Sequence, residues 1–128
     1  MGMRAGKRLM VLGSLLPLLA FALAGCGGSR PSNEVDMGVA VFEQSAVTIK
    51  AGQAAHFVDP NTGGVHIICV GKGTQCIQTA GAPDALNTAQ GLQVQAGDTR
   101  DIVFPTAGTY TVVCIIHPGM QVVVTVTS

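Results

Sequence analysis

Residues 108–120 read Gly-Thr-Tyr-Thr-Val-Val-Cys-Ile-Ile-His-Pro-Gly-Met, and no other stretch constrains the architecture of the chain as tightly. Its first half, up to Cys114, is rich in β-branched residues and indicates a strand. Pro118 and Gly119 then interrupt the run and indicate a tight turn. The chain next resumes alternation, with one face of the following strand formed by Val122, Val124 and Val126. We therefore expect two neighbouring strands joined by a short loop.

Short apolar runs of the same kind recur along the chain from residue 39 onward. Their period is two rather than 3.6, which favours strands over helices. The expected strands include residues 39–43, 47–49, 56–58, 65–70, 92–94, 102–104, 110–114 and 121–126. Seven to eight short strands with regularly spaced turn residues predict an all-β fold, a β-sandwich. Residues 71–91 are the exception, because small and polar residues dominate there, and a short helical turn is expected at residues 83–86.

The first 26 residues differ from the rest. Three basic residues precede an apolar run at residues 9–23, which ends in Leu-Ala-Gly-Cys at residues 23–26. This order is typical of a bacterial secretory signal. The ending resembles the lipobox of bacterial lipoproteins, in which the cysteine is lipid-modified and becomes the new N-terminus. An uncleaved membrane anchor is the alternative, but Pro17 and the shortness of the run weigh against it.

This interpretation divides the chain into three parts. Residues 1–25 are the expected signal peptide, residues 26–35 a flexible tether beginning at lipid-modified Cys26, and residues 36–128 the folded domain. The whole chain has no formal net charge, whereas the 103 residues left after cleavage carry four basic and seven acidic side chains. A nucleic-acid-binding protein needs a basic face, so this balance argues against one. We expect an exported protein anchored to a membrane, on the periplasmic or extracellular face of the envelope.

Three side chains that bind soft or borderline metal ions fall within seven residues of one another. Cys114, His117 and Met120 offer a thiolate, an imidazole and a thioether, a combination that suits copper. Blue-copper sites use two histidines, so a second one must come from elsewhere in the sheet. His66 opens an expected strand and is the first candidate. His56 is the competitor, but its neighbour Phe57 is expected to point into the core, which directs His56 outward.

The remaining cysteines need a separate account. Cys69 and Cys76 are separated by six residues, and disulfides persist in exported proteins. A structural disulfide is the first interpretation of this pair. A second metal site is the alternative, although no cluster of histidines or carboxylates accompanies it. Cys26 would then carry lipid and Cys114 would bind copper, so every cysteine has a role.

From about residue 39 to residue 126 the chain resembles the cupredoxins, the family of plastocyanin, amicyanin and azurin. The resemblance rests on Gly108-x-Tyr110 leading to Cys114, on the upstream His66, and on a Cys-x2-His-x2-Met loop with the short spacing of amicyanin. It implies a Greek-key sandwich with a single type 1 copper. The equatorial ligands implied are His66, Cys114 and His117, and the axial ligand is Met120. Two positions depart from the family pattern, which often has asparagine where Ile67 stands and proline where Ile116 stands.

The resemblance also implies a function, that of a one-electron carrier between redox partner proteins. In this family the second histidine reaches the surface through an apolar patch, here Ile116, His117, Pro118 and Gly119. We expect a protein without enzymatic activity, since no nucleophile–base pair or paired acids occur. We also expect it to be a monomer. One alternative is a protein that stores or delivers copper, and another is a metal-free sandwich used for adhesion or interaction.

Overall fold

Nine strands lie within the part of the chain that the computed structural model describes, Gly2 and residues 28–128. They are β1 (Glu34–Asp36), β2 (Ala46–Lys50), β3 (Ala54–Val58), β4 (Val65–Lys72), β5 (Gln75–Cys76), β6 (Leu92–Gln95), β7 (Thr99–Val103), β8 (Gly108–Cys114) and β9 (Gln121–Thr127). The expected all-β sandwich is confirmed, with the very short β1 and β5 as additional strands. The expected signal peptide, apart from Gly2, and Cys26 lie outside the described residues. No helix that is long and apolar enough to cross a membrane occurs among those described.

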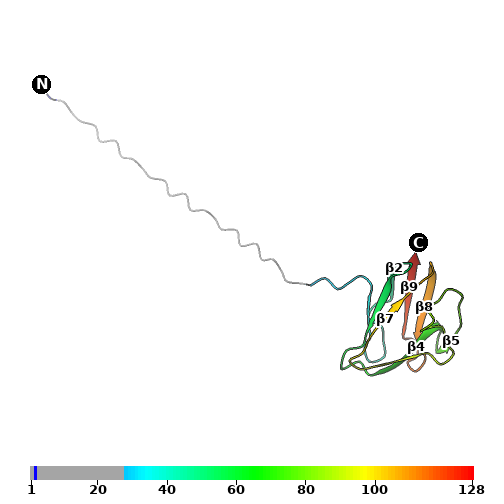
Figure 1. Ribbon diagram of the computed structural model, residues 1–128. Coiled ribbons are helices and arrows are strands. Elements are labelled where there is room, and N and C mark those ends of the chain that lie inside the picture. The colour runs from blue at the N-terminus through cyan, green and yellow to red at the C-terminus, as the bar shows by residue number, and fades with distance from the viewer. Residues whose placement is uncertain (1, 3–27) are drawn as a thin grey trace.

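The strands form two mixed sheets (Figure 1). The smaller sheet has the order β1-β3-β7, and β1 runs parallel to β3 while β7 runs antiparallel to it. The larger sheet has the order β2-β9-β8-β4-β5, with β6 also paired to β4. In this sheet β2 pairs in parallel with β9, the last strand of the chain, so the segment at residues 46–50 is hydrogen-bonded to the C-terminal strand.

The alternation of apolar residues produces one core between the sheets. On β9 the valines at 122, 124 and 126 are at most 3% exposed, whereas the residues between them are partly exposed. On β3 the same alternation buries Phe57 completely. Tyr110 on β8 is also buried, and its hydroxyl lies 2.9 Å from the carbonyl oxygen of Thr106 and 3.1 Å from that of Gly81. This contact holds the long 71–91 connection against the body of the sandwich.

One local expectation was wrong. Residues 39–43 form a loop rather than a strand, because a hydrogen bond from Gly38 N–H to the Val41 carbonyl (2.8 Å) closes a turn. Val39 is therefore 70% exposed, and the buried residues of this segment are Met37 and Phe42. At residues 83–86, where a short helical turn was expected, Leu86 N–H donates to the Pro83 carbonyl at 2.9 Å, which closes a single turn of the 3₁₀ type.

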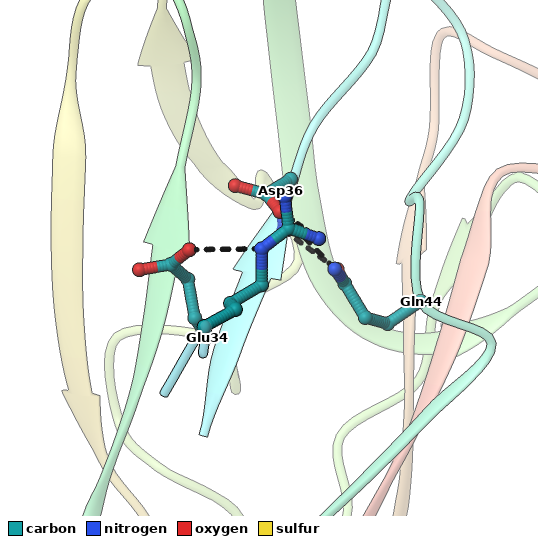
Figure 2. Close-up of polar contacts among 4 residues, drawn as sticks. Glu34, Asp36 and Gln44 are labelled. Atoms are coloured by element: carbon teal, nitrogen blue, oxygen red, sulfur yellow. Dashed lines mark hydrogen bonds and ion pairs between the residues drawn. The ribbon is translucent and has the colours of Figure 1, made fainter. Parts of the chain in front are cut away.

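The packed part of the chain also begins earlier than residue 36. Glu34 and Val35 belong to β1, and Val35 is fully buried opposite Phe57. Just upstream, the Arg30 guanidinium contacts the carboxylates of Glu34 (3.2 Å) and Asp36 (2.8 Å). Figure 2 shows the Asp36 carboxylate also accepting a 3.1 Å hydrogen bond from the Gln44 amide. Residues 34 and 35, which the sequence placed in the tether, are thus part of the sheet.

Candidate metal centre

Three metal-binding side chains meet at one end of the larger sheet. His66 lies near the start of β4, Cys114 ends β8, and His117 lies in the loop between β8 and β9. The Cys114 Sγ atom is 3.4 Å from Nδ1 of His117 and 3.9 Å from Nδ1 of His66. One ligand atom from each residue lies within 4.8 Å of the other two. The structure therefore brings together the three residues that the sequence proposed as equatorial ligands.

The register of the sheet explains why His66 and Cys114 converge. Strand β4 is antiparallel to β8, and Ile68 lies directly opposite Cys114. Residues two apart on a strand share a face, and residues opposite each other across a ladder do too. His66 therefore points to the same side of the sheet as Cys114, one pleat further along. This face is the interior, because both side chains are fully buried.

Backbone hydrogen bonds shape the loop that carries the other ligands. Cys114 N–H donates to the Met120 carbonyl at 3.0 Å, and Met120 N–H donates to the His117 carbonyl at 3.1 Å. Gly119 has a φ of 85°, a conformation that L-residues with side chains rarely adopt, which accounts for glycine at this position. The loop returns the chain so that Met120, only 1% exposed, packs in the core beside the strand of Cys114.

At Ile67, where the family often has asparagine, a main-chain hydrogen bond connects the two ligand segments. Ile115 N–H donates to the Ile67 carbonyl at 2.9 Å, so β4 and the ligand loop are tied directly next to His66 and Cys114. An isoleucine side chain does not disturb this bond, because only main-chain atoms make it. The departure at Ile67 therefore leaves a hydrogen-bonded connection between the two ligand segments.

Burial differs among the histidines of the centre. His66 is fully buried, and its pKa is lowered mainly by that burial, although the carboxylate of Asp59 opposes the shift. His117 is partly exposed, and its ring packs edge-on against that of His66 with 5.0 Å between the centroids. A neutral imidazole is the form that binds a metal ion, so burial of His66 favours ligation.

Sequence analysis missed one buried ionisable residue of the centre. Asp59 follows β3 directly, is 1% exposed, and places its Oδ2 atom 3.6 Å from Nε2 of His66. Burial raises the pKa of this carboxyl, and the nearby His66 opposes the rise. The motif Asp-Pro-Asn-Thr-Gly-Gly at residues 59–64 indicates an exposed loop, and no signal in it distinguishes a buried aspartate.

The donor set fits copper. Metal–nitrogen and metal–sulfur bonds of roughly 2.0–2.3 Å allow one ion to contact donors up to about 4 Å apart. The measured Sγ–Nδ1 separations of 3.4 and 3.9 Å lie within that limit. Two imidazoles, a thiolate and a buried thioether are the ligands of a blue-copper centre. His66, Cys114, His117 and Met120 are the residues that would hold the copper ion.

The other candidate residues lie elsewhere. His56 is on β3 in the smaller sheet, where it pairs with Asp101 across the ladder and takes no part in the cluster. Cys69 and Cys76 are joined by a disulfide, and Cys69 is fully buried on β4.

Comparisons with known proteins agree with this geometry. A family model described as copper binding proteins, plastocyanin/azurin family, matches residues 30–127. Amicyanin from Paracoccus versutus is 22% identical, with a TM-score of 0.53 over 73% of this chain and 78% of that chain. A reduced copper(I) form of an amicyanin mutant is 20% identical, with a TM-score of 0.55 over 77% and 84% of the respective chains. The structural likeness supports the fold, and the family match supplies the assignment. The chain belongs to the plastocyanin/azurin family of copper-binding proteins, the cupredoxins, and His66, Cys114, His117 and Met120 are arranged as its type 1 copper site.

Proposed function

We propose that this protein is a one-electron carrier that shuttles electrons between redox partner proteins. The observation that carries the proposal is the convergence of His66, Cys114 and His117 from two paired strands and the loop that follows them. Copper bound by these residues would supply one-electron redox chemistry, alternating between its cupric and cuprous states.

The sandwich would contribute rigidity. Cys114 and His66 project from paired strands, and the bonds from Cys114 to Met120 and from Met120 to His117 fix the connecting loop. Ligands held in this way keep nearly the same positions in both oxidation states. A site that needs little rearrangement on gaining or losing an electron transfers it quickly, which suits a carrier.

His117 is the ligand best placed to pass the electron to a partner. It is partly exposed, whereas His66, Cys114 and Met120 are at most 1% exposed. Around it lie Ile116, which is 45% exposed, and the exposed Pro118 and Gly119. This uncharged surface suits brief docking, because interfaces of electron-transfer proteins are small and weak.

Absorption spectroscopy of the copper-loaded full chain tests the proposal. We expect an intense visible band from charge transfer between the Cys114 thiolate and copper(II), and reversible bleaching when the protein is reduced. The substitution Cys114→Ser should abolish the band, since it removes the thiolate. A colourless copper complex of the wild-type protein would refute the carrier function.

A copper storage or delivery protein is the alternative, and burial of the ligands argues against it. A delivery protein must release its ion readily, whereas three of the four ligands here are at most 1% exposed. Mixing the holoprotein with a copper-free acceptor separates the two functions. A carrier should retain its visible band over many turnovers of reduction and oxidation, while rapid loss of the band to the acceptor would favour delivery.

We also propose that the protein is exported and anchored through lipid on Cys26. The Leu-Ala-Gly-Cys sequence at residues 23–26 supports this placement. Arg30 contacts the domain four positions after Cys26, and four residues span at most roughly 14 Å. The anchor would therefore keep the copper domain close to the membrane. Expressed in a bacterium, the wild-type chain should fractionate with membranes and Cys26→Ser should not; equal fractionation would contradict the anchor.

A further inference from the structure

Within residues 28–128, three buried polar side-chain atoms at the copper end of the sheet have no hydrogen-bond partner. They are both carboxylate oxygens of Asp59 and Nε2 of His66. The Nε2–Oδ2 distance of 3.6 Å is within the range of an ion pair but longer than a hydrogen bond. Both side chains are fully buried. An unpaired carboxylate in such a place costs free energy, so its presence requires an explanation.

The surrounding chain is built around the Asp59 carboxylate. Asp59 N–H donates to the Asp98 carbonyl and its own carbonyl accepts from Gly97 N–H, both at 2.9 Å, which fixes the backbone. The following loop folds over the side chain at Gly63. A β-carbon added at Gly63 would come within 1.7 Å of Oδ1, so only glycine leaves room for the carboxylate.

The orientation of the His66 ring places its Nε2 atom next to the Asp59 carboxylate. Nδ1 is directed to the Cys114 sulfur, so Nε2 points away from the ligands and toward Asp59. An imidazole that binds a metal through Nδ1 carries its proton on Nε2 and needs an acceptor there. Resting on the proposed copper function, we propose that Asp59 is a positioning residue, whose carboxylate accepts the Nε2 proton of His66 and holds a negative charge beside the copper site.

Burial favours the neutral form of Asp59, but a hydrogen bond from Nε2 and a positively charged copper site beside it favour the carboxylate. A charged acceptor affects the copper centre in a way that a neutral acceptor does not. With Cys114 as a thiolate and both imidazoles neutral, the site carries one net positive charge with copper(II) and none with copper(I). A buried carboxylate at Asp59 therefore stabilises the oxidised state more than the reduced one, and little solvent is present to screen it. Asp59 lowers the reduction potential of the centre.

Backbone carbonyls are the competing acceptors. The backbone groups of Gly38 and Gly63 act on the His66 ring and oppose the fall of its pKa, but Nε2 has no hydrogen-bond partner among the described residues. They would orient the ring equally well without adding a full charge. The reduction potential therefore distinguishes the two arrangements, whereas copper binding alone does not.

The test compares the reduction potentials of copper-loaded full-length wild type, Asp59→Asn and Asp101→Asn. Asp101 is the matched control, because it also pairs with a histidine, but its side chain is 64% exposed. We expect Asp59→Asn to keep a thiolate band and to raise the potential by 59 mV or more, a tenfold change in the preference for copper(II) over copper(I). Asp101→Asn should leave the potential unchanged. Equal potentials in all three proteins would overturn the role of Asp59, whereas a wild-type protein without a thiolate band would instead refute the copper function.

A second measurement uses the wild-type holoprotein and does not depend on folding of the variant. Infrared difference spectra between the oxidised and reduced states show only groups that respond to the electron. We expect a carboxylate band that shifts between the two states, because Asp59 would be the carboxylate next to the ligands. A difference spectrum without a carboxylate band would overturn the proposal.

Discussion

The described part of the chain contains two histidine–carboxylate pairs, which differ in distance, burial and position in the fold. His56 and Asp101 lie opposite each other on β3 and β7, 2.5 Å apart, with side chains 36% and 64% exposed. His66 and Asp59 lie at the copper end, 3.6 Å apart and fully buried. The two side chains of the first pair are closer together, but burial gives the charges of the second pair the larger effect on their surroundings. Solvent screens the exposed charges, whereas the buried ones act on everything near them.

Strand β3 and the residue that follows it supply one member of each pair. His56 and Asp59 are three positions apart, so the period of two places them on opposite faces. Phe57, between them, is fully buried, which fixes His56 as outward-facing and Asp59 as inward-facing. This short segment, residues 56–59, thus presents one ionisable group to water and another to the metal centre.

Replacing His66 and His56 in turn tests the difference between the two pairs most directly. His66→Ala removes a ligand from the buried cluster, so we expect complete loss of the thiolate–copper band. His56→Ala should leave the band unchanged, since His56 is in the other sheet. The measurement is the visible absorption spectrum after copper loading. Loss of colour in His56→Ala would show that the ligand assignment is wrong.

Removal of copper should affect stability next most strongly. A ligand that binds only the folded state stabilises it by about 2.7 kcal/mol at 100 times its dissociation constant and about 4.1 kcal/mol at 1,000 times. We expect chelation to lower the free energy of unfolding of wild type and His56→Ala by such an amount. His66→Ala should show a much smaller change in the same denaturant titration. An equal loss in His66→Ala would mean that copper acts elsewhere.

Much of the metal centre was predictable because three of its four ligands lie within seven residues of one another in the sequence. The ligands Cys114, His117 and Met120 lie on one strand and its loop, where the spacing alone places them together. His66 followed from its place at the opening of an expected strand and from the resemblance to the cupredoxins. The outward direction of His56 followed from alternation beside Phe57, and its half-exposed pairing with Asp101 agrees with that prediction.

Other features depend on contacts between distant segments and were not predictable. Asp59 resembles any turn aspartate in sequence, and only the packing of Gly63 over it makes it buried. Val39 alternates like a strand residue, but a turn closed by Gly38 exposes it. Strand β1 has one apolar residue, Val35, which is too few to show a period.

The disulfide offers a way to separate fold stability from the metal centre. Cys69 lies on β4, three residues after His66, and its bond to Cys76 closes a short loop. Chain entropy predicts that replacing both cysteines by serine lowers the free energy of unfolding by roughly 2–3 kcal/mol. We expect the visible band to persist, because the register between β4 and β8 aligns His66 with Cys114 independently of the bond. Loss of colour without unfolding would show that the disulfide positions His66.

The smallest expected effect concerns the exposed pair itself. Exposed ion pairs contribute about 0.2–1 kcal/mol, and salt weakens them further. A double-mutant cycle with His56→Ala and Asp101→Ala should give a coupling energy in this range that shrinks in high salt. The short distance between His56 and Asp101 alone would suggest a larger value, so a coupling above 2 kcal/mol would contradict the argument. Burial would then no longer explain why one pair matters to the copper centre while the other matters little to the fold.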